Sequence, residues 1–173
     1  VGKHKSYRHL DIRHWAKGWK FAGVVRGLYK DRRYGLAGIH SYATGFGPHA
    51  RFEARPEFTV GKSASRFEVR YLVHPQGGRF QVSVDGKVHG RVDTRARPAE
   101  GQPPLPLSYR QERVYRVQVA DGPRAFKIKA LGFGLVRLLG AVVERDGPGL
   151  VYDSLGQLGA QLRDYLRVDA DHW

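Results

Sequence analysis

The polar side chains that could carry chemistry lie near the end of the chain. Asp169 and His172 have the Asp-x-x-His spacing found in some hydrolases, and Ser154 follows Asp153 just before an apolar pattern of helical period. Ser154 lacks the Gly-x-Ser-x-Gly surroundings of a nucleophile elbow, so a serine that caps the following turn is the simpler interpretation. Asp169 and His172 have no nucleophile beside them in the sequence, and we expect both side chains to be solvated.

A metal site is not indicated. His4, His9 and His14 lie near Asp11, but a five-residue spacing matches neither a helical i, i+4 pair nor the alternation of a strand. The sequence contains no cysteine, which excludes thiolate metal sites, disulfides and cysteine nucleophiles. We therefore expect neither a metal ion nor another cofactor.

Residues 146–160 are rich in glycine, and within them the predicted structure changes from strand to helix. Gly147, Gly149, Gly156 and Gly159 lie in this joint. A backbone N–H exposed at the start of a helix could face a small anionic group there.

Length and charge limit the classes of function. A chain of 173 residues with 41% hydrophobic residues suits one domain with a real core, and the net charge of +14 favours anionic partners such as acidic glycans or nucleic acid. The basic residues are spread along the chain, so nucleic acid is the less favoured of these partners. No apolar window is long enough to span a bilayer. Because the chain lacks methionine, we expect a processed chain or a fragment.

Short alternating runs dominate residues 19–143. Residues 66–73 are the clearest strand, and Asp85-Gly86 predicts a tight hairpin between the runs on either side of it. A second hairpin is predicted around Asp121-Gly122-Pro123, and the proline-rich residues 93–112 predict a long exposed loop. Residues 135–143 form a more continuous apolar run, typical of a strand buried on both faces.

These elements predict a mainly β protein, a jelly-roll-like β-sandwich of the carbohydrate-binding-module type. Leucines at three- and four-residue steps predict a C-terminal amphipathic helix over about 157–167. We divide the chain into an irregular lead-in (1–20), the sandwich (21–145), and a joint with the first helix of another domain (146–173).

Two stretches resemble a known family. Residues 139–160, LGAVVERDGPGLVYDSLGQLGA, are similar to the joint between an inserted β-sandwich and the hydrolase domain in bacterial SGNH (GDSL-type) hydrolases of the peptidoglycan O-acetylesterase kind. Residues 6–13, SYRHLDIR, resemble the stretch that enters the insert. The resemblance implies that Gly159 supplies an oxyanion-hole N–H, although Leu158 stands where the group has Asn. The serine nucleophile block and the Asp/His pair of that family are absent from this chain.

Three functions remain open at this point. The first is a non-catalytic part of an SGNH-type esterase that acts on an anionic or O-acetylated envelope glycan, with the rest of the hydrolase domain as its partner. The second is a free-standing carbohydrate-binding module in which Trp15, Trp19 or Tyr42 offers a surface on which a sugar stacks. For the two tryptophans, the simpler expectation is that they cover one end of the hydrophobic core. The third is a basic nucleic-acid-binding protein. The first two functions imply a bacterial periplasmic or cell-envelope location.

Overall fold

The computed structural model describes residues 5–10, 16–23, 31–35, 38–54, 63–146, 150–151, 161, 164, 166 and 168. Twelve strands lie within these residues. They are β1 (Lys5–Leu10), β2 (Ala16–Lys17), β3 (Lys20–Gly23), β4 (Ile39–Ala43), β5 (Phe46–Ala54), β6 (Ala64–Val73), β7 (Arg79–Val84), β8 (Lys87–Asp93), β9 (Gln111–Gly122), β10 (Arg124–Gly132), β11 (Val136–Glu144) and β12 (Leu150–Val151).

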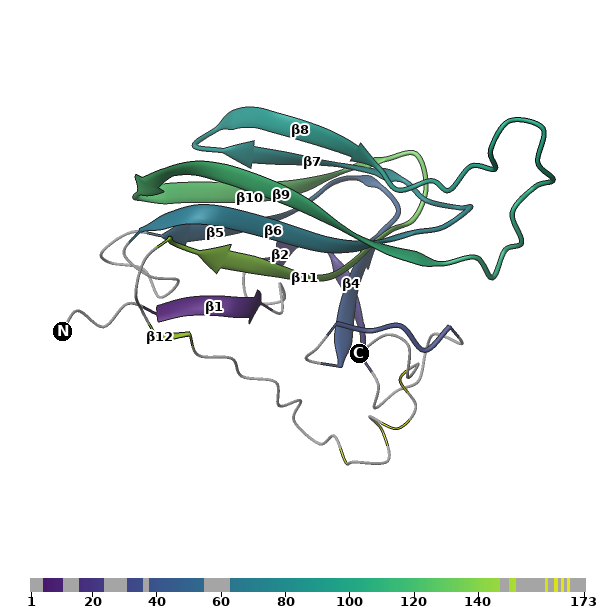
Figure 1. Ribbon diagram of the computed structural model, residues 1–173, viewed down its shortest axis with the longest axis horizontal. Coiled ribbons are helices and arrows are strands. Elements are labelled where there is room, and N and C mark those ends of the chain that lie inside the picture. The colour runs from purple at the N-terminus through teal and green to yellow at the C-terminus, as the bar shows by residue number, and fades with distance from the viewer. Residues whose placement is uncertain are drawn as a thin grey trace.

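The strands form two sheets that pack face to face (Figure 1). The five-stranded sheet has the order β2-β5-β10-β7-β8, and all its pairs are antiparallel. In the seven-stranded sheet, β11 lies beside β1, β4 and β6, and β9 pairs with β6. The predicted mainly β sandwich is thus confirmed. The predicted helix over 157–167 falls almost entirely on residues outside the described ones.

Aromatic rings from both sheets fill the core between them. Phe67 of β6 stacks on Phe126 of β10 with 4.8 Å between ring centroids, and Phe52 of β5 lies 5.5 Å from Phe67. All three side chains are fully buried. Because side chains alternate between the two faces of a strand, a buried row on one face of β5, β7 and β10 leaves the intervening residues on the outer face.

The predicted turn at Asp85-Gly86, the predicted long loop and the predicted doubly covered strand are confirmed. Asp85 and Gly86 have φ values of +48° and +82°, as a two-residue hairpin turn requires, and they join β7 to β8. Residues 94–110 form a long loop that is exposed over most of its length and extends beyond the ends of the sheets (Figure 1). β11 is buried at every position except Gly140, as a strand covered on both faces should be.

The second predicted hairpin is wrong. β9 and β10 are consecutive, but β9 pairs with β6 in one sheet whereas β10 pairs with β5 and β7 in the other. Residues 121–123 therefore carry the chain from one sheet to the other instead of folding it back. Proline at position 123 cannot donate a ladder hydrogen bond, which suits a crossing between sheets as well as it suits a hairpin turn. Local sequence does not distinguish the two.

The sequence also indicates an irregular lead-in over residues 1–20, and β1 and β2 lie inside that range. Each of these strands lies beside a longer strand of its sheet, β11 for β1 and β5 for β2. The partner strand supplies the backbone hydrogen bonds, so a short strand can form without a strong pattern of its own.

A buried polar cluster lies on the outer side of the seven-stranded sheet. The Arg137 side chain is 1% exposed and forms an ion pair with Asp31, to which Arg110 also donates a hydrogen bond of 2.9 Å. Arg137 Nη2 also donates to the carbonyl of Arg33 at 3.0 Å. Burial alone raises the pKa of Asp31, but hydrogen bonds from Arg137 and Arg110 and the charge of Arg137 lower it to about 2. The cluster is therefore fully charged at neutral pH.

Two buried histidines make stability depend on pH. Burial, helped by the positive charge of Arg137, lowers the pKa of His40 to about 3, and burial together with Arg110 lowers that of His74 to about 4. Both stay neutral in the folded state while the unfolded chain takes up protons near the usual pKa of 6.5.

We therefore expect the free energy of unfolding to fall as the pH drops from about 6.5 to about 4, by about 3 kcal/mol for His74 alone at 1.36 kcal/mol per pKa unit. A further loss follows between about pH 4 and 2 as Asp31 is protonated in the unfolded chain first. Urea unfolding at a series of pH values measures this slope. His74→Gln should flatten the upper part of the slope, and a wild-type slope near zero between pH 6.5 and 4.5 would contradict the assignment.

Candidate functional site

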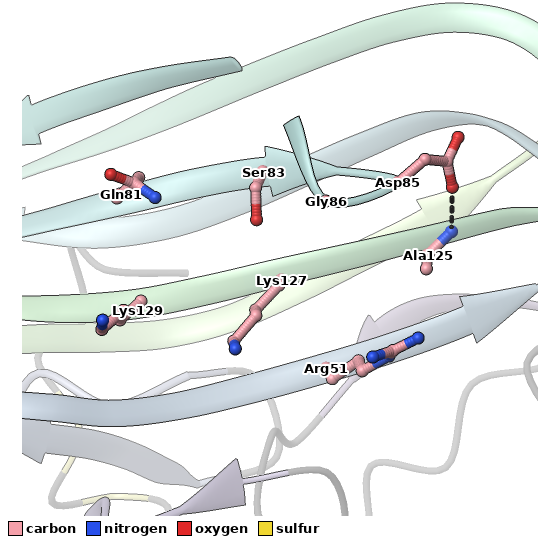
Figure 2. Close-up of a pocket in the computed structure, with 8 residues that line it drawn as sticks. All are labelled: Arg51, Gln81, Ser83, Asp85, Gly86, Ala125, Lys127 and Lys129. Atoms are coloured by element: carbon pink, nitrogen blue, oxygen red, sulfur yellow. Dashed lines mark hydrogen bonds between the residues drawn. The ribbon is translucent and has the colours of Figure 1, made fainter. Parts of the chain in front are cut away.

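The outer face of the five-stranded sheet carries a set of polar side chains on its three central strands. Lys127 of β10 lies opposite Arg51 of β5 on one side and opposite Ser83 of β7 on the other. Lys129, two residues along β10, lies opposite Gln81 of β7. Figure 2 shows the two lysines on β10 between Arg51 and the two β7 residues. This face is the reverse of the buried Phe126 and Ile128 row, so the sheet's alternation places all five together.

These side chains border a hollow of about 550 Å³ that is open to solvent on the sheet surface. We call it the cationic hollow. The residues that line it come from β5, β7, the β7–β8 turn and β10, and they are Arg51, Gln81, Ser83, Asp85, Gly86, Ala125, Lys127 and Lys129. A hollow of this size suits a small ligand or a few units of a polymer.

The charges around the cationic hollow do not cancel. Arg51 forms an ion pair with Glu53 on the same strand. Asp85 accepts hydrogen bonds from the backbone N–H of Ala125 at 2.8 Å and from Arg124 at 3.0 Å (the Ala125 bond is drawn in Figure 2). Within the described part of the chain, no carboxylate lies within ion-pair distance of Lys127 or Lys129. Two lysines on adjacent outward positions of one strand therefore give the hollow its excess positive charge.

The hydrogen-bonding groups of the hollow fit hydroxyl-rich ligands. Gln81 supplies an amide and Ser83 a hydroxyl, and each can both donate and accept. Arg91 of β8 donates to Gln81 Oε1 at 3.3 Å, which fixes the orientation of the amide. A carboxylate or sulfate can then meet the lysine ammonium groups while neighbouring hydroxyls meet the amide and the serine.

The opposite surface of the sandwich is not comparable. On β11 the side chains that face away from the core, among them Arg137, Leu139 and Glu144, are buried, and Leu72 of β6 beside them is also buried. Tyr34 and Val168 pack together as a separate small apolar cluster, and Arg32 Nη2 donates to the carbonyl of Leu166 at 2.9 Å. The outer face of the seven-stranded sheet is thus covered along β11, whereas β9 of the same sheet keeps exposed side chains such as Arg116.

The predicted sugar-stacking residues are not part of the cationic hollow. Trp19 is 5% exposed and belongs to the core, the default role given to it above. Tyr42 is half-buried on β4 of the other sheet, where its ring lies 6.0 Å from that of His40. Trp15 and Gly159 lie outside the described residues, as do Ser154, Asp169 and His172. The described residues contain no cluster of three potential metal ligands. They also contain no helix that is long and apolar enough to cross a membrane.

Comparison with solved structures finds carbohydrate-binding modules. A module from Clostridium stercorarium, in complex with cellobiose, is 12% identical, with 84% of this chain and 98% of that chain covered and a TM-score of 0.48. A β-1,3-glucan-binding family 6 module from Bacillus halodurans is 18% identical, with 83% and 99% covered and a TM-score of 0.48. A module of Cellvibrio mixtus lichenase 5A, in complex with cellotriose, is 15% identical, with 81% and 96% covered and a TM-score of 0.46. No protein-family model and no curated protein matches the sequence.

The predicted SGNH hydrolase portion is wrong. Four of the structures that resemble the chain are family 6 carbohydrate-binding modules, and none of these four is an SGNH hydrolase. Of the stretches that suggested the hydrolase, residues 139–144 belong to β11 and residues 6–10 to its neighbour β1, and most of the remaining residues lie outside the described ones. The apolar pattern of these two strands is that of ordinary sandwich strands. The predicted esterase function is wrong for the same reason, and the predicted hydrolase-domain partner is not supported.

The sequence contains one signal for the cationic hollow. Between the apolar residues Phe126, Ile128 and Ala130 lie Lys127 and Lys129, both necessarily on the outward face of a half-buried strand. The spacing therefore indicates a paired positive charge. It does not indicate which strands flank β10, so Arg51 and Gln81 could not be placed beside the lysines from sequence alone.

Proposed function

We propose that this chain is a carbohydrate-binding module that binds an anionic glycan in the cationic hollow. The observation that carries the proposal is the pair Lys127 and Lys129 on the central strand of an open sheet face, with no carboxylate in ion-pair distance among the described residues. The lysines lie between groups that suit sugar hydroxyls. A bacterial periplasmic or cell-envelope location, where the chain would meet an anionic envelope glycan, is part of the same proposal.

Burial of an acidic group against these lysines needs no rearrangement of the backbone. The hollow is built on paired strands, and its turn is fixed by the hydrogen bonds of Asp85. Sites on such elements are preorganised, which reduces the entropy lost on binding. Arg51 can contribute to the ligand while it retains Glu53, because a guanidinium has five N–H donors.

Isothermal titration of the chain with polygalacturonate tests the proposal. Fully methyl-esterified polygalacturonate is the matched control, since it keeps the sugar and removes its charge, and dextran sulfate distinguishes sulfate from carboxylate recognition. We expect polygalacturonate or dextran sulfate to bind and the methyl ester to bind at least tenfold more weakly, which corresponds to about 1.4 kcal/mol.

Salt should weaken this binding. Raising NaCl from about 0.1 M to about 1 M shortens the Debye length from about 10 Å to about 3 Å and screens the lysine charges. Affinity that is equal for the charged and esterified polymers, or insensitive to salt, would remove the anionic ligand from the proposal. Failure to bind any of the three polymers would remove the glycan function itself.

A further inference from the structure

Two exposed aromatic rings lie at one end of the cationic hollow. Phe46 begins β5, and Phe133 lies in the turn between β10 and β11. Each side chain is 70% exposed. Leu131 pairs with Phe46 and Gly132 with Arg79, so the two phenylalanines flank the same end of β10. A register shift between Lys129 and Leu131 interrupts the alternation there. The exposure of two large apolar side chains at the same end of a strand requires a physical explanation.

The conformation of Phe133 adds to the cost of this exposure. Its φ is +64°, a region that bulky L-residues rarely occupy and that glycine or asparagine occupies more easily. The turn is nonetheless firmly held. Arg95 Nη2 donates to the carbonyl of Phe133 at 2.8 Å, and the N–H of Leu135 donates to the carbonyl of Gln76 at 2.9 Å. A strained residue fixed by its surroundings is characteristic of functional sites.

Each ring also lies beside a cation. Lys129 Nζ is 4.2 Å from the centroid of the Phe46 ring, and Arg79 Cζ is 5.2 Å from that of Phe133. Lys129 lines the cationic hollow, so the Phe46 ring adjoins it, and Phe133 lies beside Arg79 at the same end of β10. An acidic sugar has an apolar C–H face together with a negatively charged group. A phenyl ring with an adjacent ammonium or guanidinium complements both parts of that sugar.

We propose that Phe46 and Phe133 form a stacking subsite that extends the cationic hollow, so that the module binds several consecutive units of an acidic glycan and prefers polymers to short oligosaccharides. The inference rests on the proposed function. In this arrangement Lys127 and Lys129 hold charged groups in the hollow, while the two rings stack on sugar units beyond it. Arg79 keeps its 3.2 Å ion pair with Asp93 and is thereby held beside Phe133.

Calorimetry with galacturonate oligomers of two lengths tests the subsite. We compare the wild type with Phe46→Ala and Phe133→Asn, and use Leu107→Ala as the matched control, because Leu107 is equally exposed but lies in the long loop after β8. We expect each phenylalanine variant to lower the affinity for the hexamer about tenfold, as for the loss of one stacking contact, and to leave the dimer within about twofold. Leu107→Ala should change neither.

Stability provides a second, independent readout for Phe133. If the residue were there for folding, Phe133→Asn would lower the thermal midpoint. We expect the midpoint to stay or to rise, because asparagine tolerates a positive φ and little buried area is lost. A lower midpoint together with unchanged hexamer affinity would assign Phe133 to the fold and overturn the subsite.

The outcomes separate this inference from the function on which it rests. Hexamer binding that needs Lys127 but is indifferent to both phenylalanines would overturn the subsite and leave the anionic-glycan function standing. A wild-type chain that binds neither oligomer would overturn both. Tighter binding of a dodecamer of deoxythymidine than of the hexamer, lost in the phenylalanine variants, would assign the rings to base stacking and overturn the glycan proposal.

Discussion

Replacement of Arg137 by methionine is expected to lower the free energy of unfolding by about 3 to 5 kcal/mol, the usual cost of removing one partner of a buried ion pair. Methionine fills much of the volume, so the loss is mainly electrostatic. Asp31 would keep Arg110 but lose the guanidinium that forms the closer contact. For a protein of ordinary stability this is a large share of the total.

Urea unfolding at neutral pH measures the effect. The matched control is Arg116→Met on β9, where Arg116 Nε lies 3.0 Å from Glu68 Oε1 and the arginine side chain is exposed. Loss of this ion pair should lower the free energy of unfolding by less than about 1 kcal/mol. The double variant Asp31→Asn with Arg137→Met should recover part of the loss, because it removes the buried carboxylate that the single variant leaves underpaired. Equal costs for Arg137→Met and Arg116→Met would show that the cluster contributes no more than a surface pair.

Reversal of the charges in the cationic hollow should abolish glycan binding. Lys127→Glu combined with Lys129→Glu is expected to weaken binding of polygalacturonate at least a hundredfold, because charge-assisted hydrogen bonds contribute about 1.5 to 3 kcal/mol each and the new carboxylates repel the ligand. Stability should change little, since both side chains point outward from the sheet.

The control for this variant separates local contact from overall charge. Lys20→Glu changes the charge of an exposed lysine on β3 of the other sheet. The control double variant combines Lys20→Glu with Arg116→Glu, both on that sheet. It changes the net charge by the same amount as Lys127→Glu with Lys129→Glu. They should lower affinity only slightly through the long-range field. A similar loss in both double variants would mean that the ligand senses the basic protein as a whole and not the hollow.

The sequence was sufficient for the class of fold because alternation is a local property. Phe67, Val69, Tyr71 and Val73 reveal a half-buried strand without knowledge of its neighbours. Asp85-Gly86 likewise identifies the turn between β7 and β8 by the φ values that these two residues permit. Pairing is not local. Asp121-Gly122-Pro123 could end a hairpin or cross between sheets, and only the partners of β9 and β10 decide between them.

The candidate site was harder to predict for the same reason. Lys127 and Lys129 are informative only when Arg51, Gln81 and Ser83 are known to lie beside them. Trp19 is a core residue, whereas Phe46 and Phe133 are exposed, and nothing in the local sequence of the two phenylalanines indicates that exposure. The resemblance to a hydrolase failed because strand-like apolar runs with glycines occur in many folds.

The position of β10 between β5 and β7 has a consequence for how the protein folds. β5 pairs with a strand whose residues lie 70 to 85 positions later in the chain, from 124 − 54 to 131 − 46, and β7 pairs with the same strand. Contacts of such long sequence separation pay a large loop-closure entropy before they stabilise the structure, which makes folding slow. The cationic hollow cannot exist until β10 has paired with β5 and β7. During synthesis, β5 and the β7–β8 hairpin therefore expose unpaired edges until residues 124–132 are available, and at these edges the nascent chain is open to misassembly.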